Sequence, residues 1–343
     1  MLWIIIIGLF LGFLGLYYGS KLVVIGLENM ALRFGISQLL IGLTILSIGT
    51  SLPEIAVSVM GGVDKIFGLN QGIDAIVIGN KVGSFLTQLT LIIGILGIVQ
   101  PIFISRWKLK REGVSMAIAL LIFFFIAIDG IITQFEALIL IISYIIYLIL
   151  IIYSERRVTR KQREIQEFLK QRDGIEIKET KPDCEERETP DCSLSKDIAY
   201  TVFGLLALII GAEITLLSGH ELAREFGIPE NIVGIFILGL ETSLPELIAS
   251  IVAIRRDSFG IAVGDILGSN ICDILLATGS GAIIVSFKVP HVLLVYEIPL
   301  LFIIIGVIFL FFWSKEILNR WEAGIMVGIF VGYAIFKFLF FQI

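Results

Sequence analysis

The string TSLPE occurs twice in this chain, at 50–54 and at 242–246, each time inside an otherwise apolar stretch. In both copies a proline, which interrupts helical hydrogen bonding, precedes a glutamate, whose charge is costly in an apolar medium. The similarity extends further, since nearly half of the positions in 32–54 are identical to those in 224–246. A second match follows each copy, IVIGNKVGSFLTQ at 76–88 and IAVGDILGSNICD at 261–273. The chain therefore contains two related halves.

The apolar content places these halves in a membrane. Hydrophobic residues make up 57% of the 343 residues and the mean hydropathy is +0.97, which is too apolar for a soluble domain. A membrane-spanning helix needs about 20 predominantly apolar residues. We expect an all-α membrane protein with ten transmembrane helices, at 2–25, 37–62, 73–99, 113–130, 135–153, 197–219, 230–254, 260–286, 292–313 and 320–342. Eight spans with two re-entrant segments would also fit.

Five of these spans precede the second copy, so the second copy enters the membrane in the opposite sense. The sequence thus predicts two inverted-topology five-helix repeats, 1–153 and 197–343, joined by a polar linker at 154–196. We expect the start of that linker to be helical and the rest to be solvated.

Positively charged residues indicate the orientation. With ten spans, the segments richest in Lys and Arg all fall on one side, which should be cytoplasmic. They include Arg106 to Arg111, Arg255 with Arg256, and the linker. We therefore expect a multi-pass protein of the cell membrane with a cytoplasmic 154–196 loop and both termini outside.

The TSLPE string also has a local structural interpretation. Ser51 or Ser243 would cap a helix, with the proline in the first turn and Glu54 or Glu246 at the third helical position. A cap in the middle of a membrane means that the preceding half-helix ends there. Its last carbonyl groups, near Ser47 and Gly239, would then be free to bind a cation.

The polar side chains of the two motifs offer oxygen donors. Ser84 with Gln88, and Ser269 with Asp273, are spaced i, i+4 and so share a helix face. The candidate ligands are Glu54, Glu246, Asp273, Gln88, Thr50, Thr242, Ser51, Ser243, Ser84, Ser269, Ser47 and Gly239. Hard cations such as Ca²⁺ prefer oxygen ligands, whereas softer metals prefer imidazole or thiolate. We expect inorganic cations and the lipid bilayer as partners, with no cofactor and no nucleic acid. A single chain could be the functional unit.

The paired motifs GTSLPEIAVS with IGNKVGS and TSLPELIAS with VGDILGSNICD resemble the two alpha-repeats of the calcium:cation antiporter superfamily, in its sodium/calcium exchanger branch. The resemblance covers both halves. It implies a ten-helix inverted repeat and Ca²⁺ held between Glu54 and Glu246. It also implies Na⁺ at adjacent sites and alternating access by sliding of the first and sixth helices. The chain is then a secondary active antiporter rather than an enzyme, with Ca²⁺ and Na⁺ as transported ions.

Several residues depart from the family pattern. Gln88 stands where Asn or Asp is usual, Asp265 replaces an Asn, Glu241 replaces a Gly, and Lys81 replaces an apolar residue. Lys81 could pair with Glu241 or Asp265, or extend to a membrane interface. These departures leave open a proton/calcium antiporter, in which Glu241 would carry the proton, or exchange of another divalent cation. A passive channel or a sensor is a further alternative.

Overall fold

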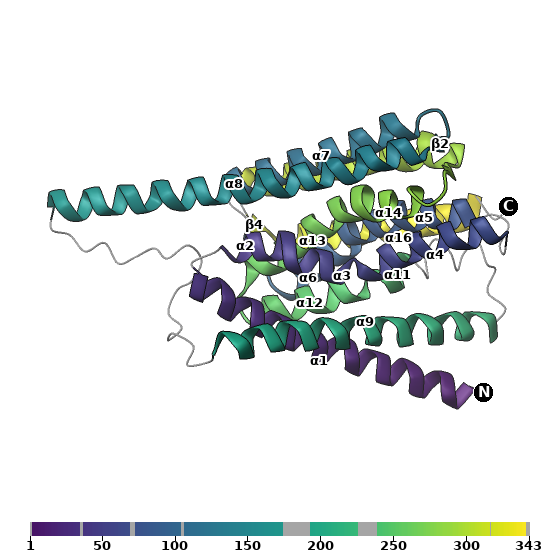
Figure 1. Ribbon diagram of the computed structural model, residues 1–343, viewed down its shortest axis with the longest axis horizontal. Helices are drawn as coiled ribbons and strands as arrows, with labels where there is room; N and C mark the ends of the chain where they lie inside the picture. The colour runs from purple at the N-terminus through teal and green to yellow at the C-terminus, as the bar shows by residue number, and fades with distance from the viewer. Residues whose placement is uncertain are drawn as a thin grey trace.

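The computed structural model describes residues 2–34, 37–68, 73–103, 106–173, 193–225, 239–315 and 317–340. These residues form a nearly all-helical, elongated bundle (Figure 1). The first half contains α1 (Leu2–Phe34), α2 (Gln38–Ile41), η1 (Gly42–Leu46), α3 (Ser47–Thr50), α4 (Leu52–Phe67), α5 (Ile73–Thr87), η2 (Gln88–Ile92), α6 (Ile93–Val99), β1 (Ile102–Phe103), α7 (Arg106–Ala127), β2 (Ile131–Ile132) and α8 (Gln134–Asp173). The second half contains α9 (Leu194–Glu225), α11 (Gly239–Thr242), α12 (Leu244–Arg255), α13 (Phe259–Cys272), η4 (Asp273–Ala277), α14 (Thr278–Ala282), β3 (Phe287–Lys288), η5 (Leu293–Glu297), α15 (Ile298–Lys315), β4 (Ile317–Leu318) and α16 (Arg320–Phe340).

The element boundaries recur in the register of the sequence repeat. The alignment that superposes the two TSLPE strings also brings both ends of α3 onto both ends of α11. The alignment of the second motifs does the same for the π-helical turns η2 and η4 and for the short strands β1 and β3. Strand β1 pairs antiparallel with β4, and β2 pairs antiparallel with β3, so each strand pair joins one half to the other.

Six helices among the described residues are long and apolar enough to cross a membrane, or seven if the bent pair 38–50 and 52–67 forms one span. Counted with the bent pair, these helices correspond to seven of the ten expected spans. The other three, at 113–130, 230–254 and 320–342, do not meet that measure in the described part of the chain. Helix α7 starts with charged turns that shorten its apolar part, and 226–238 lie outside the described residues. The chain is a multi-pass membrane protein, because several of its helices meet the length and apolarity of a span.

Helices α1 and α9 pack side by side along one side of the bundle (Figure 1). Glycines allow their backbones to approach closely, as in other membrane helix pairs. A Cβ atom added to Gly204 would lie only 2.7 Å from the backbone nitrogen of Val23 and 2.8 Å from the carbonyl oxygen of Gly19. The reciprocal position is equally tight, since a Cβ on Gly19 would lie 2.7 Å from the backbone nitrogen of Leu208.

We therefore expect Gly204→Leu to force α1 and α9 apart, because the obstructing atoms belong largely to the backbone and cannot rotate away. Overpacking of this kind lowers the free energy of unfolding by about 1–3 kcal/mol. Gly306→Leu is the matched control, since nothing lies within 4 Å of a Cβ at that exposed glycine of α15. Thermal denaturation in detergent measures both variants. Equal melting temperatures for the two variants would contradict the packing described for α1 and α9.

The interior of the bundle is formed by the helices that carry the second motif of each half. In the spans 73–99 and 259–282, 72% and 83% of the most apolar window is buried, against 28% in α1. Helices α5 and α13 are thus surrounded by protein, whereas the N-terminal half of α1 keeps an exposed apolar surface suited to lipid. The candidate polar residues on α5 and α13 consequently lie inside the bundle rather than at its surface.

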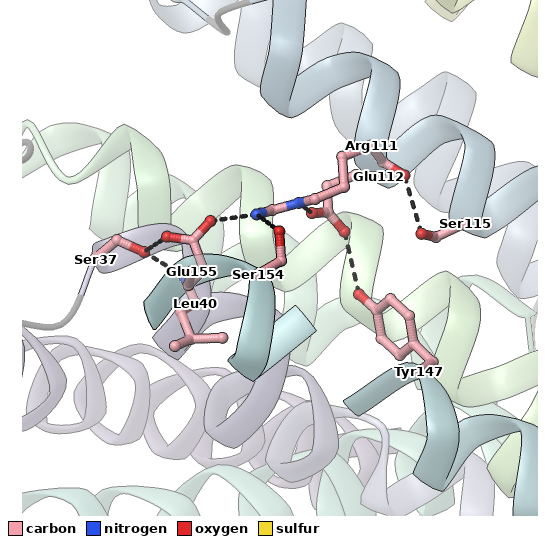
Figure 2. Close-up of polar contacts among 8 residues, drawn as sticks. All are labelled: Ser37, Leu40, Arg111, Glu112, Ser115, Tyr147, Ser154 and Glu155. Carbon is pink, nitrogen blue, oxygen red and sulfur yellow. Dashed lines mark hydrogen bonds and ion pairs between the residues drawn. The ribbon is translucent and has the colours of Figure 1, made fainter. Parts of the chain in front are cut away.

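A second polar cluster joins α7, α8 and the start of α2 (Figure 2). Arg111 Nε donates to Glu112 Oε1 at 2.5 Å, and Arg111 Nη1 donates to Glu155 Oε1. Tyr147 donates to Glu112 Oε2 at 3.2 Å, and Ser37 donates to Glu155 Oε2 at 2.8 Å. Arg111 was expected between two spans, on the cytoplasmic side. It lies in the second turn of α7 with only 14% of its side chain exposed, because two buried carboxylates compensate its charge.

Helix α8 continues without interruption to Asp173, well beyond its apolar part. The expectation that the linker begins as a helix is therefore confirmed. Residues 174–192 lie outside the described part of the chain.

Candidate cation-binding site

Each TSLPE string interrupts a helix in the same way. Ser51 joins α3 to α4 with φ −78° and ψ 4°, and Ser243 joins α11 to α12 with φ −88° and ψ 3°. The two parts of the first broken helix are bent by 41°. Pro53 and Pro245 occupy the second helical position and Glu54 and Glu246 the third, as the sequence predicted. The break therefore places each carboxylate in the first turn of the helix that follows it.

The prediction that a serine side chain caps the second half-helix is wrong in both copies. Neither Ser51 nor Ser243 makes a side-chain cap hydrogen bond. The backbone departs little from helical geometry at these residues, since Ile55 N–H still donates to the carbonyl oxygen of Ser51 at 3.0 Å. The serine hydroxyls are consequently left for other partners.

The carbonyl group of Ser47 is also not free, contrary to expectation. It accepts from the backbone N–H of Ser51 at 3.1 Å and from Ser269 Oγ at 3.4 Å. The carbonyl that loses its helical donor belongs to Gly49, because Pro53, four residues later, has no N–H. Gly239, the counterpart of Ser47, lies against the backbone of α5, where an added Cβ would be 3.4 Å from the carbonyl carbon of Gly83.

One group of polar side chains connects the two halves through Asp273. Ser84 and Gln88 on the first half both donate to Asp273 Oδ2, each at 3.1 Å. Gln88 also donates to Ser84 Oγ at 3.0 Å, as expected from their i, i+4 spacing, and Ser84 and Ser243 share a hydrogen bond of 3.0 Å. Gln88 and Asp273 are equivalent positions of the repeat and begin the π-helical turns η2 and η4. Such turns are frequent at functional sites.

Three further hydroxyls of the predicted set, those of Thr50, Thr242 and Ser269, also bond between the halves, whereas the Ser51 hydroxyl has no hydrogen-bond partner among the described residues. Thr50 donates to Asp265 Oδ1 at 3.0 Å and lies 3.3 Å from Ser269 Oγ. Both Ser84 and Ser269 thus bond across to the other half, but only Ser84 also bonds to its i+4 neighbour, so the two predicted i, i+4 pairs behave differently. The equivalent contact in the other half is Asn80 Nδ2 to Thr242 Oγ1 at 3.1 Å. Each broken helix therefore contacts the buried helix of the opposite half through an equivalent threonine.

The two glutamates stand apart from these networks. Glu54 and Glu246 are fully buried, yet neither carboxylate accepts a hydrogen bond of normal geometry from any described residue. Gln88 Oε1 and Asp273 Oδ1 are buried without a partner in the same sense. Buried polar oxygens in proteins are almost always hydrogen-bonded, and unsatisfied ones call for an explanation. These unpaired carboxylate and amide oxygens lie among polar groups that have hydrogen-bond partners, and they are therefore suited to binding a cation.

The acidic side chains do not by themselves enclose a metal ion. Within the described part of the chain, no three His, Cys, Asp or Glu side chains form a group that could hold one. Any cation bound here would therefore need neutral oxygens, such as serine and threonine hydroxyls or the carbonyl group of Gly49, in addition to the carboxylates. Calcium accepts mixed sets of carboxylate, carbonyl and other oxygens, about 6–8 in number.

Three residues next to the predicted ligands were missed as members of the network. Asn80 and Asp265 hold the two threonines, and Ser250 donates to Asp265 Oδ2 at 3.3 Å. A signal for them exists in the sequence, because the alignment of IVIGNKVGS with IAVGDILGS pairs Asn80 with Asp265. Ser250 likewise ends the string TSLPELIAS, as Ser58 ends TSLPEIAVS.

Lys81 lies at the same site, and it does not pair with Asp265, one of its two suggested partners. It is fully buried and so does not extend to a membrane interface. Its ammonium group donates to the backbone carbonyl of Glu54 at 2.5 Å and to Asn80 Oδ1 at 3.1 Å. Asp265 bonds to Thr50 and Ser250 rather than to Lys81. The side chain of Glu241, the other suggested partner, lies outside the described residues.

Comparison with known proteins adds an independent line of evidence. The sodium/calcium exchanger protein family matches residues 4–153 and 196–339. The chain is 28% identical to an uncharacterized membrane protein of Methanocaldococcus jannaschii over 94% of both sequences. It is 27% identical to the sodium/calcium exchanger MaX1 of Methanosarcina acetivorans, over 96% of this chain and 97% of that protein. A solved structure of the sodium-calcium exchanger NCX_Mj, soaked with Na⁺ and Sr²⁺, matches with a TM-score of 0.75 at 26% identity over 100% of both chains.

Proposed function

Because the chain belongs to the sodium/calcium exchanger family, whose members exchange cations across membranes, we propose that it moves Ca²⁺ across the cell membrane in exchange for Na⁺. The observation that carries this proposal is the pair of buried, unpartnered carboxylates of Glu54 and Glu246 at equivalent places of two broken helices. A charged side chain at membrane depth is costly and usually belongs to an ion pathway.

In this proposal the two glutamates bind Ca²⁺ directly. Asp273 and Gln88 each contribute the oxygen that has no hydrogen-bond partner among the described residues. The hydroxyls and backbone groups of the motifs complete the oxygen set for Ca²⁺ and, in turn, for Na⁺: the hydroxyls of Thr50, Ser51, Ser84, Thr242, Ser243 and Ser269, and the carbonyl groups of Gly49 and Gly239. Calcium and sodium share these ligands, so occupancy by one excludes the other, and that exclusion couples their movements.

We further propose that residues 1–153 and 197–343 are two five-helix repeats of opposite membrane orientation, ten spans in all, joined by a cytoplasmic linker at 154–196. The recurrence of the same element boundaries in both halves supports this arrangement. Figure 1 marks both chain ends at the same end of the bundle, as ten spans require, and we assign that end to the outside.

Alternating access then follows from a movement of α1 with α9. These helices contact each other through glycines and lie beside α12 and α3, which belong to the broken helices. Sliding of the pair along the bundle would open the site to one side of the membrane and close it to the other. The buried helices α5 and α13 would stay in place and keep the ligands together.

The test is calcium uptake into liposomes. Purified protein in sodium-loaded liposomes is diluted into sodium-free medium containing radioactive calcium, and a parallel preparation carries a pH gradient instead. We expect uptake with the sodium gradient and none with the pH gradient. Uptake with the pH gradient alone would replace Na⁺ by H⁺ as the coupling ion. Calcium movement that needs neither gradient and does not saturate would indicate a channel.

A further inference from the structure

Lys81 introduces a positive charge beside the candidate ligands. Its ammonium group is fully buried and is held by a backbone carbonyl oxygen and an amide oxygen, of Glu54 and Asn80. It makes no ion pair with a carboxylate among the described residues, although its charge acts on the carboxylates of Glu54 and Asp273. Carbonyl and amide oxygens are the same kinds of donor that hard cations use.

The equivalent position of the second half has no such charge. The alignment of the second motifs places Ile266 where the first half has Lys81, and Asp265 where the first half has Asn80. The described part of the second half therefore contributes three carboxylates to the site, from Glu246, Asp265 and Asp273. The first half contributes one carboxylate, from Glu54, together with the Lys81 ammonium group. The two halves have similar backbones but very different charge.

We propose that the Lys81 ammonium group takes the place of one monovalent coupling ion, so that each transport cycle exchanges one Na⁺ fewer than it would without this lysine. The inference rests on the proposed sodium/calcium exchange and concerns its stoichiometry. The physical reason is charge compensation: the cations that a buried acidic site takes up must balance its negative charge. A cation tethered to the chain supplies one of those positive charges permanently. It cannot leave with the transported ions.

The ratio of exchanged ions determines the calcium gradient that a sodium gradient can balance. At zero membrane potential, a tenfold sodium gradient balances a calcium ratio that grows by a factor of about ten for each additional Na⁺ in the cycle. We expect Lys81→Met to balance a calcium ratio about tenfold higher than the wild-type protein at the same sodium gradient. Lys81→Arg, which keeps the charge, should behave as wild type. Lys21→Met removes an exposed lysine of α1 and serves as a further control.

The measurement uses liposomes held at zero membrane potential, in which the calcium ratio that gives no net flux is determined for each variant. A second measurement does not require transport. The apparent calcium Kd in detergent is titrated at several Na⁺ concentrations, and the slope of log Kd against log Na⁺ counts the sodium ions displaced. Lys81→Met should have a slope larger by one.

An unchanged balance ratio and slope in Lys81→Met, with a wild-type protein that exchanges Na⁺ for Ca²⁺, would overturn this inference alone. A folded Lys81→Met that no longer binds calcium would also overturn it, because removing a competing charge should not weaken cation binding. A wild-type protein that moves no calcium under a sodium gradient would instead contradict the proposed function, and this inference would fall with it.

Discussion

Glu246→Gln is expected to reduce sodium-driven calcium uptake at least about 100-fold. Mutation of a residue that only supports a metal ligand typically lowers metal affinity 10–100-fold. Removal of a carboxylate that binds the ion directly should lower it at least as much. The substitution keeps the size of the side chain and removes its charge. Because both oxygens of Glu246 lack a hydrogen-bond partner among the described residues, the change breaks no side-chain hydrogen bond there that could account for a structural loss.

Glu54→Gln should have a similar effect, since the two residues occupy equivalent places in the repeat. Glu136→Gln is the matched control. Glu136 is a glutamate in the first turn of α8 that accepts from Thr133 at an exposed position, and its replacement should leave uptake unchanged. Calcium binding in detergent, measured on the same preparations, separates loss of binding from loss of movement. Normal calcium affinity in both glutamine variants would contradict the role of these carboxylates as ligands.

Arg111→Met is expected to destabilise the protein by about 3–5 kcal/mol, because breaking a buried ion pair leaves an uncompensated charge. Removal of the guanidinium group would take away the cation that the buried carboxylates of Glu112 and Glu155 share, while Tyr147 and Ser37 would still donate hydrogen bonds to them (Figure 2). The measurement is the free energy of unfolding, or the melting temperature, in detergent.

Two further variants identify the cause. Lys110→Met removes an exposed cation from the same helix and should have little effect. Combining Arg111→Met with Glu112→Gln and Glu155→Gln should recover most of the lost stability, because no buried charge then remains unpaired. A triple variant as unstable as Arg111→Met alone would show that packing of the arginine side chain, and not its charge, is what matters at this cluster.

The sequence was sufficient to predict the helical membrane fold and the family. Apolar segments of spanning length and the two TSLPE strings carry that information locally, and local patterns survive without knowledge of the tertiary structure. The family assignment was confirmed by the match over both halves. The same reasoning located Pro53 and Glu54 correctly within the first turn of α4.

What the sequence did not predict depends on contacts between the halves. The hydrogen bonds of Ser84 and Gln88 to Asp273, and of Thr50 to Asp265, join residues far apart in the chain. The periodicity of apolar residues along the chain does not indicate which residues of the two halves come into contact. The π-helical turns that begin at Gln88 and Asp273 were also missed, because neither motif carries a pattern that distinguishes such a turn from an α-helix.

The ion pairs of Arg111 are a further feature that could not be predicted. The sequence indicated only that this arginine belongs to a basic segment between spans, because charge counts alone do not distinguish a paired arginine from an exposed one. Its partner Glu155 lies far along the chain, at the end of the apolar part of α8. Its burial could not be predicted, because compensation of a buried charge is a tertiary property.

The most direct test of the central claim, one cation site between the two broken helices, is diffraction from crystals soaked with strontium. Strontium is a heavier analogue of calcium whose anomalous scattering locates the ion. We predict a single peak between the carboxylates of Glu54 and Glu246, lost in crystals of Glu246→Gln and displaced by high sodium. A peak confined to Asp265 and Ser250, or one that persists in Glu246→Gln, would contradict the account.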